Sequence, residues 1–88
     1  MVDYDAVQKR IAANLRSLRS EHGITQMHLA EYMGVSQGSV SKWMRALVFP
    51  DLKSIIALAD LFGVTVSEIV GDVKSDKFEN SIDKEKAE

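Results

Sequence analysis

The chain of 88 residues contains no cysteine. This absence excludes a disulfide scaffold, a thiolate metal site and a cysteine nucleophile, and it fits a protein that works in a reducing compartment. The longest apolar run, IIALA at residues 55–59, is far too short to cross a membrane. The N-terminal stretch MVDYDAVQ carries acids where a secretory signal would carry bases followed by an apolar core. We therefore expect a cytoplasmic protein without a membrane partner.

The sequence also lacks the signatures of catalysis and of metal or cofactor binding. It has no Gly-rich phosphate loop and no pairing of a nucleophile with a base, and a chain of this length has little room for a pocket. His22 and His28 have no acids at ligand spacing around them, so no metal site is expected. We expect no enzymatic activity and no cofactor.

The net charge of −2 argues at first against a nucleic-acid partner, but its distribution argues for one. Residues 72–88 contain six acids and four lysines, so this segment alone supplies the −2. Between Lys9 and Lys53 there are seven bases and three acids, which leaves a local excess of +4. Such an excess is typical of a nucleic-acid-binding surface. The alternative is a scattered, solvated face, as many small charge excesses are.

Apolar residues recur every three or four positions, without repeats and without strand-like alternation, which predicts an all-α fold. We predict five helices, over residues 3–22, 26–33, 36–45, 51–62 and 65–70. The expected core stripes are Tyr4, Val7, Ile11, Leu15 and Leu18 on the first helix and Leu52, Ile55, Ile56, Ala59 and Phe62 on the fourth. Thr65 and Glu68 form a capping box at the start of the fifth.

Residues 72–88 read DVKSDKFENSIDKEKAE and are polar and charged. Such a composition cannot bury enough apolar surface to fold by itself, so we predict a disordered tail after a folded domain of residues 1–71. In the alternative, Phe78 and Ile82 form one face of a short helix.

The segment from Gln26 to Arg45 is typical of a helix-turn-helix. Gly34 stops its first helix, because glycine adopts the left-handed backbone of a helix C-terminus without steric cost. Ser36 caps the second helix, and Trp43 belongs to its buried side. Its outward side is polar and basic and consists of Gln37, Gly38, Ser41, Lys42 and Arg45.

The chain resembles the lambda-repressor-like DNA-binding domains, also called the XRE or Cro/C1 type of helix-turn-helix. The resemblance covers roughly residues 7–71. It rests on TQMHLAEYMGVSQGSVSKWM, on Pro50-Asp51 seven residues after Trp43, and on LADLFGVTVSEIVG. It implies a compact five-helix bundle, over residues 1–71, whose third helix reads the major groove of double-stranded DNA.

The resemblance also implies the residues that contact DNA. Gln37 would read a base, since a glutamine amide can bond N6 and N7 of adenine. Lys42 would reach a guanine or a phosphate, and Gln26 would bind a phosphate and brace Gln37. Arg16 would add charge toward the phosphate backbone. Besides Arg16, the expected set is Gln26, Ser36, Gln37, Gly38, Ser39, Ser41, Lys42, Arg45, Arg19 and Lys53.

Three positions depart from the family's pattern. Gly38 stands where relatives carry a base-reading side chain. Met44 replaces a glutamate that pairs with an arginine of the first helix, which would leave Arg19 without that partner and available to DNA. Residues 46–49, Ala-Leu-Val-Phe, replace a loop that offers glycine and a base. This apolar loop either packs under the fourth helix or contacts another protein.

We expect a sequence-specific transcription regulator, a bacterial or phage repressor that binds a palindromic operator as a homodimer and associates with the nucleoid. Its own concentration, a protein antagonist or a partner chain would control it. The expected dimer surface consists of Val66, Ile69, Val70 and Phe49. The alternative function is an antitoxin or adaptor module that binds a partner protein through residues 46–49 or through the tail.

Overall fold

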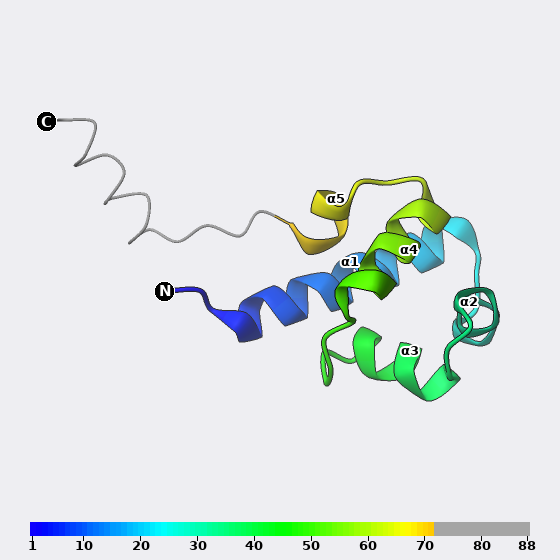
Figure 1. Ribbon diagram of the computed structural model, residues 1–88, viewed down its shortest axis with the longest axis horizontal. Coiled ribbons are helices and arrows are strands. Elements are labelled where there is room, and N and C mark those ends of the chain that lie inside the picture. The colour runs from blue at the N-terminus through cyan, green and yellow to red at the C-terminus, as the bar shows by residue number, and fades with distance from the viewer. Residues whose placement is uncertain (72–88) are drawn as a thin grey trace, which may run out of the picture.

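A computed structural model describes residues 1–71, and this part of the chain folds into five helices (Figure 1). The helices are α1 (Tyr4–His22), α2 (Gln26–Met33), α3 (Gln37–Met44), α4 (Leu52–Phe62) and α5 (Val66–Val70). The predicted all-α fold with a helix-turn-helix is confirmed. The predicted disorder of residues 72–88 lies outside the described residues.

A side chain caps the start of each helix, and these caps explain the small differences from the predicted bounds. Asp3, Thr25, Ser36, Asp51 and Thr65 each accept a hydrogen bond from the backbone N–H three residues later. Cap residues lie half inside a helix, and for this reason the first, third, fourth and fifth helices begin one residue later than predicted. The predicted capping box at the start of α5 is present.

The turn between α2 and α3 is the one that the sequence predicts. Gly34 has φ of 69° and ψ of 31°, and its N–H donates to the carbonyls of Ala30 and Glu31. This left-handed residue ends α2 and allows the chain to restart at Ser36 within two residues. α2 packs against α3 and α4, while α1 packs against α3 and α5.

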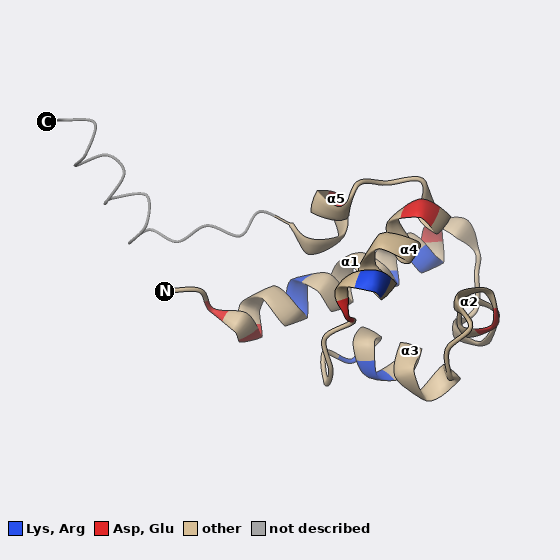
Figure 2. Ribbon diagram, in the orientation of Figure 1, with Lys and Arg blue, Asp and Glu red and all other residues tan. Residues whose placement is uncertain are grey.

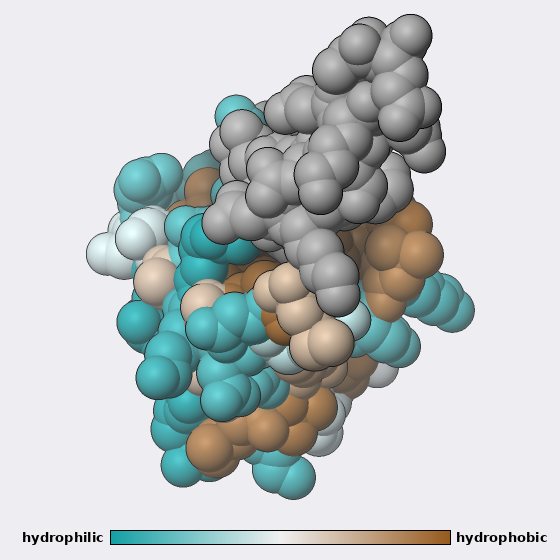
Figure 3. Space-filling model, turned by 90° about the vertical axis from the view of Figure 1, so that its left-hand side faces the viewer, coloured by the Kyte–Doolittle hydropathy of each residue, from teal (hydrophilic) through white to brown (hydrophobic). Residues whose placement is uncertain are grey.

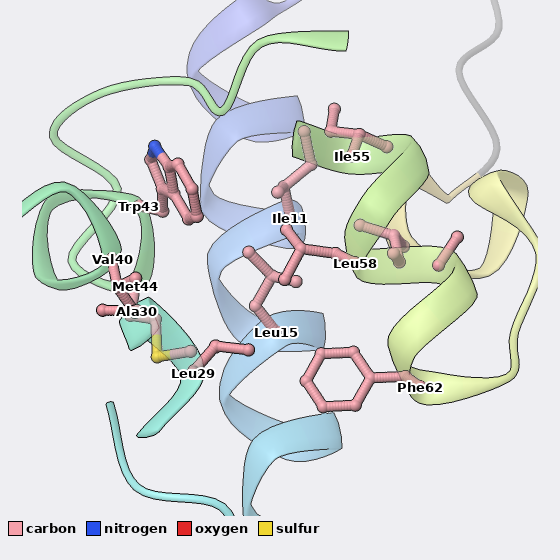
Figure 4. Packing of buried hydrophobic residues seen from close by; sticks show 12 residues of the cluster. Ile11, Leu15, Leu29, Ala30, Val40, Trp43, Met44, Ile55, Leu58 and Phe62 are labelled. Atoms are coloured by element: carbon pink, nitrogen blue, oxygen red, sulfur yellow. The ribbon is translucent and has the colours of Figure 1, made fainter. Parts of the chain in front are cut away.

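The core lies on both sides of α1. Figure 4 shows Ile11 and Leu15 of α1 between Trp43 of α3 and Leu58 and Phe62 of α4. Ile11, Leu15 and Leu58 are almost completely removed from solvent, and Trp43 is buried as predicted. The remaining members of the cluster are Leu29, Ala30, Val40, Met44, Ile55, Ala59 and Ile69.

Three residues that were expected in the core are exposed. The exposed fractions are 67% for Tyr4, 67% for Leu52 and 54% for Ile56, so the prediction is wrong for these positions. On α4 the buried side runs through Ile55, Leu58, Ala59 and Phe62. Ile56 follows Ile55 directly and is therefore turned about 100° away from the buried side. Tyr4 lies at the end of α1 that extends past α3 and α4 in Figure 1.

None of the helices within residues 1–71 combines the length and the apolar character that spanning a bilayer requires.

Candidate nucleic-acid interface

α3 is divided between a buried side and an open side. Val40, Trp43 and Met44 are buried against the rest of the domain, at the spacing of one helical face. The open side contains no acidic residue, and Lys42 and Arg45 place two positive charges at its C-terminal end. Figure 2 shows α3 and the residue after it with blue segments and no red one. This side therefore offers hydrogen bonds and positive charge.

The structure sorts the expected DNA-binding residues by their exposure. Those with exposed side chains, or an exposed backbone for glycine, are Ser36, Gln37, Gly38, Lys42, Arg45 and Lys53. Those that are half-buried are Gln26, Ser39, Ser41 and Arg19. A groove whose lining includes Gly34, Val35, Asp51 and Lys53 shows that Lys53 of α4 lies beside the turn that precedes α3.

Ser36 and Ser39 use most of their hydrogen-bonding capacity on each other. The hydroxyl of Ser36 accepts a bond from the backbone N–H of Ser39 at 3.1 Å, and the two hydroxyl oxygens lie 2.9 Å apart. Whichever hydroxyl donates in this pair, one O–H remains for an outside acceptor. The two serines therefore supply a single hydroxyl donor to a ligand.

Three arginines of α1 bond to backbone carbonyls of the protein itself. Arg10 Nε donates to Val70 at 3.0 Å, Arg16 Nη1 donates to Met44, and Arg19 Nη1 donates to Ile24 at 3.0 Å. Each bond fastens a helix end or a turn to α1. Part of the basic excess in the sequence is therefore structural rather than available to a ligand.

The structure contradicts the expectation that Arg19 is available to DNA. Its guanidinium is half-buried and bonds to the turn between α1 and α2, so it is not freely available to DNA. Met44, which occupies the place of the family's glutamate, is buried in the core and offers no carboxylate. Accordingly, the Nε of Arg19 is buried without a hydrogen-bond partner in the described part of the chain.

The loop of residues 46–49 has a fixed backbone and outward side chains. The N–H of Leu47 donates to the carbonyl of Lys42 at 2.9 Å. With its side-chain oxygen facing the loop, Gln8 accepts bonds from the N–H groups of Val48 and Phe49, at 3.2 and 3.3 Å. The side chains of residues 47–49 are exposed, so the alternative that they pack under α4 is wrong. Figure 3 shows apolar surface at the lower edge, where Figure 1 places this loop.

The expected dimer surface changes at one position. Val66 and Phe49 are exposed and Val70 is half-buried, but Ile69 has no exposed surface and belongs to the core. The helix is held with this side inward because Asn14 Nδ2 donates to the carbonyl of Ile69 at 2.8 Å. Ile69 is therefore not available to a second chain, and the prediction is wrong at this position.

The residues that position the helices cannot be recognised from the sequence. Gln8, Arg10 and Asn14 of α1 all bond to backbone groups of distant segments. Their only signal in the sequence is a row of polar residues at a spacing of two to four, beside the apolar stripe of α1. That signal is equally typical of a solvated helix face.

Comparison with known proteins identifies the family. Residues 15–69 match the family described as helix-turn-helix. The chain is 34% identical over 56 residues to the HTH-type transcriptional activator BcrR of Enterococcus faecalis, which covers 64% of this chain and 28% of that protein. It is 31% identical over 64 residues to the antitoxin PezA of Streptococcus pneumoniae, which covers 73% of this chain and 40% of that protein. The chain thus spans less than half the length of either relative.

A solved structure agrees with these relatives. The fold is similar to that of the SOS-response transcriptional repressor LexA from Eubacterium rectale, with a TM-score of 0.70 and 28% identity over 74% of this chain and 69% of that chain. The matched segment contains the complete α2, α3 and α4. This family and this fold are those of DNA-binding regulators rather than of enzymes. The chain belongs to the helix-turn-helix family, in its lambda-repressor-like (Cro/C1) group.

Proposed function

We propose that this chain is a transcription regulator that places α3 in the major groove of an operator. The observation that supports this most directly is the open side of α3, which is polar, basic and free of acids while the opposite side is buried. In repressors of this architecture the N-terminal part of the second motif helix contacts base edges. The exposed residues of that part of α3 are Gln37 and Gly38.

The exposed side chains divide by chemistry into readers and anchors. Gln37 carries an amide that can bond adenine through two groups at once, so it is the proposed reader of sequence. Lys42, Arg45 and Lys53 are exposed cations, which set affinity and salt dependence. Gln26, the first residue of α2, and the free hydroxyl of the Ser36–Ser39 pair are proposed phosphate contacts, with Ser41 in a minor role.

One α3 covers only a few base pairs, so we propose a homodimer on a palindromic operator, with half-sites about one helical turn apart. Val66, Val70 and Phe49 are the proposed dimer contacts. We propose repression as the outcome, in the cytoplasm and on nucleoid DNA. LexA is a repressor by name whereas BcrR is an activator by name. A reporter gene placed behind the selected operator distinguishes the two outcomes by the sign of the change in expression.

Selection from a random DNA pool tests the proposal. The full chain should enrich one palindromic sequence. The logarithm of its binding constant should fall linearly with the logarithm of salt concentration, with a slope of about −0.9 per neutralised phosphate. Enrichment of no sequence over several rounds, together with a slope near zero, would show that the chain does not bind DNA as proposed.

A second function, that of an antitoxin or adaptor, is favoured by two observations. One is the likeness to PezA, and the other is the exposed apolar loop of residues 46–49. Co-purification from the native host with a second small protein would support it, and a Leu47→Ser, Phe49→Ser double variant should abolish that co-purification. If the double variant retains the partner, the loop is not the binding surface.

A further inference from the structure

The fold gives no reason for the glycine at position 38. The other four glycines of the chain, at positions 23, 34, 63 and 71, all have positive φ, which favours glycine. Gly38 lacks this property, and it lies inside α3. A Cβ built on Gly38 would meet only the Ser36 hydroxyl oxygen, at the ordinary contact distance of 3.8 Å. Any small side chain therefore fits here without strain.

Glycine is also an unfavourable choice for this helix. It loses more backbone freedom on folding than any other residue and ranks just above proline in helix propensity, whereas alanine ranks first. α3 has only eight residues, and so short a helix has few other bonds to compensate. A residue that breaks a local rule without a structural gain points to a functional requirement at that position.

The missing side chain would extend into open space on the outer side of α3. Gly38 is exposed, and its neighbour in the chain is Gln37, the proposed reader of bases. Both residues belong to the first turn of α3, which lies closest to the bases in the proposed docking geometry. Any atom added at position 38 would therefore stand between the α3 backbone and the DNA.

We propose that Gly38 determines specificity by its lack of a side chain. The bare backbone at this position lies in van der Waals contact with the operator and sets how deeply α3 enters the groove, and this depth brings Gln37 within reach of its base. The inference rests on the proposed DNA-binding function. In complexes with random DNA, held through phosphates alone, α3 does not reach this depth.

A size series at position 38 tests the proposal on the full chain. Gly38→Ala should raise the Tm by about 4–8 °C, because alanine favours the helix. It should nevertheless weaken binding to the selected operator by tenfold or more, and Gly38→Leu should weaken it further. Binding to random DNA should change by less than threefold for both variants.

A compensated variant separates the contact from the change in stability. Ala13 is exposed within α1 and belongs to none of the proposed contacts. Ala13→Gly should therefore lower helix stability by about as much as Gly38→Ala raises it, without touching a proposed contact with DNA. The double variant Gly38→Ala, Ala13→Gly should return the Tm to the wild-type value and keep the full loss of operator binding. The single variant Ala13→Gly should bind the operator like the wild type.

Two results would overturn the inference. One is a Gly38→Ala variant that binds the operator within threefold of the wild type. The other is an equal loss on operator and random DNA, which would mean a general disturbance of α3. Failure of the proposed function itself looks different, because the wild-type chain would then select no operator at all.

Discussion

Arg16 of α1 donates a hydrogen bond from its guanidinium to the backbone carbonyl of Met44, the last residue of α3. The last carbonyls of a helix have no partner within the helix, and they form the negative end of its dipole. The Arg16 guanidinium gives one of these carbonyls a hydrogen-bond donor and places a positive charge at the negative end of the dipole. This bond fastens the C-terminal end of the proposed recognition helix to the longest helix of the domain, and it adds to the core packing that holds α3 in place.

Loss of this bond should lower stability. We expect Arg16→Met to reduce the free energy of unfolding by about 1 kcal/mol, since the stem of the side chain is kept and the hydrogen bond to the Met44 carbonyl is lost. Arg45→Met is the control, because Arg45 is exposed on the open side of α3, and it should change stability by less than about 0.5 kcal/mol. Urea denaturation measures both. Equal effects of the two variants would contradict a structural role for Arg16.

Ala46 should be replaceable by glycine with a gain in stability. Its φ of 56° makes it the one residue other than glycine with a positive φ among residues 1–71. A residue with a Cβ in the left-handed region is strained by about 1–2 kcal/mol. Glycine removes this strain, but it makes the unfolded chain more flexible, which offsets part of the gain in stability. We therefore expect Ala46→Gly to raise the free energy of unfolding by roughly 0.5–1 kcal/mol, as measured by urea denaturation. A loss of stability would show that the loop backbone is not strained.

Gln37→Ala tests the proposed reader of bases. We expect the variant to lose about 1–3 kcal/mol of discrimination at one base-pair position in each half-site of the operator, while its affinity for other positions stays unchanged. Binding to a panel of operators with single base-pair changes measures this. If the variant binds every sequence more weakly by the same factor, Gln37 is not a reader.

The cap of α4 should contribute a pH-dependent stability. The Asp51 carboxylate accepts hydrogen bonds from the hydroxyl and from the backbone N–H of Ser54. These two bonds, the hydroxyl's first, lower the pKa of Asp51 below its ordinary value of 3.8. This lowered pKa stabilises the fold above pH 3.8, and the contribution is lost as pH falls from there through the lowered pKa. Asp51→Asn retains a capping side chain but does not titrate, so its stability relative to the wild type should rise in that window. If the urea midpoints of the wild type and of Asp51→Asn change by the same amount across this pH range, the prediction is wrong.

Removal of residues 72–88 tests the predicted boundary of the folded domain. Since the chain loses only its predicted disordered tail, we expect the truncated protein to keep its urea midpoint, its dimer affinity and its operator binding. Denaturation, analytical ultracentrifugation and a binding titration against the full chain measure these three quantities. Loss of dimerisation in the truncated protein would show that the tail belongs to the subunit contact.

Local structure in this protein follows from local chemistry. Ser36 caps α3 by bonding to a backbone N–H three residues later, and Gly34 ends α2 through its own left-handed backbone. Both effects act over a few bonds along the chain, so the sequence alone predicts the helices and the turn between them. The same holds for the buried position of Trp43 and for the membership of the helix-turn-helix family.

Side chains that bond across the fold could not be predicted in this way. Arg10 and Asn14 reach carbonyls at the end of α5, and Arg19 closes the turn after α1. On the sequence they are ordinary polar residues of a helix surface, because nothing local shows which distant carbonyl lies within reach. For this reason the sequence alone predicts a DNA contact for Arg19, whereas the structure shows a bond within the protein.

The choice between neighbouring helix faces also needed the tertiary structure. On α4 the apolar residues form two overlapping stripes, and packing into the core covers the one with Leu58 and leaves Leu52 and Ile56 outside. On α5 the same competition buries Ile69 and exposes Val66. The sequence by itself determined the helices, their caps and the helix-turn-helix. Only the tertiary structure decided which apolar faces are covered and which basic residues remain for a ligand, because both depend on contacts between segments far apart in the chain.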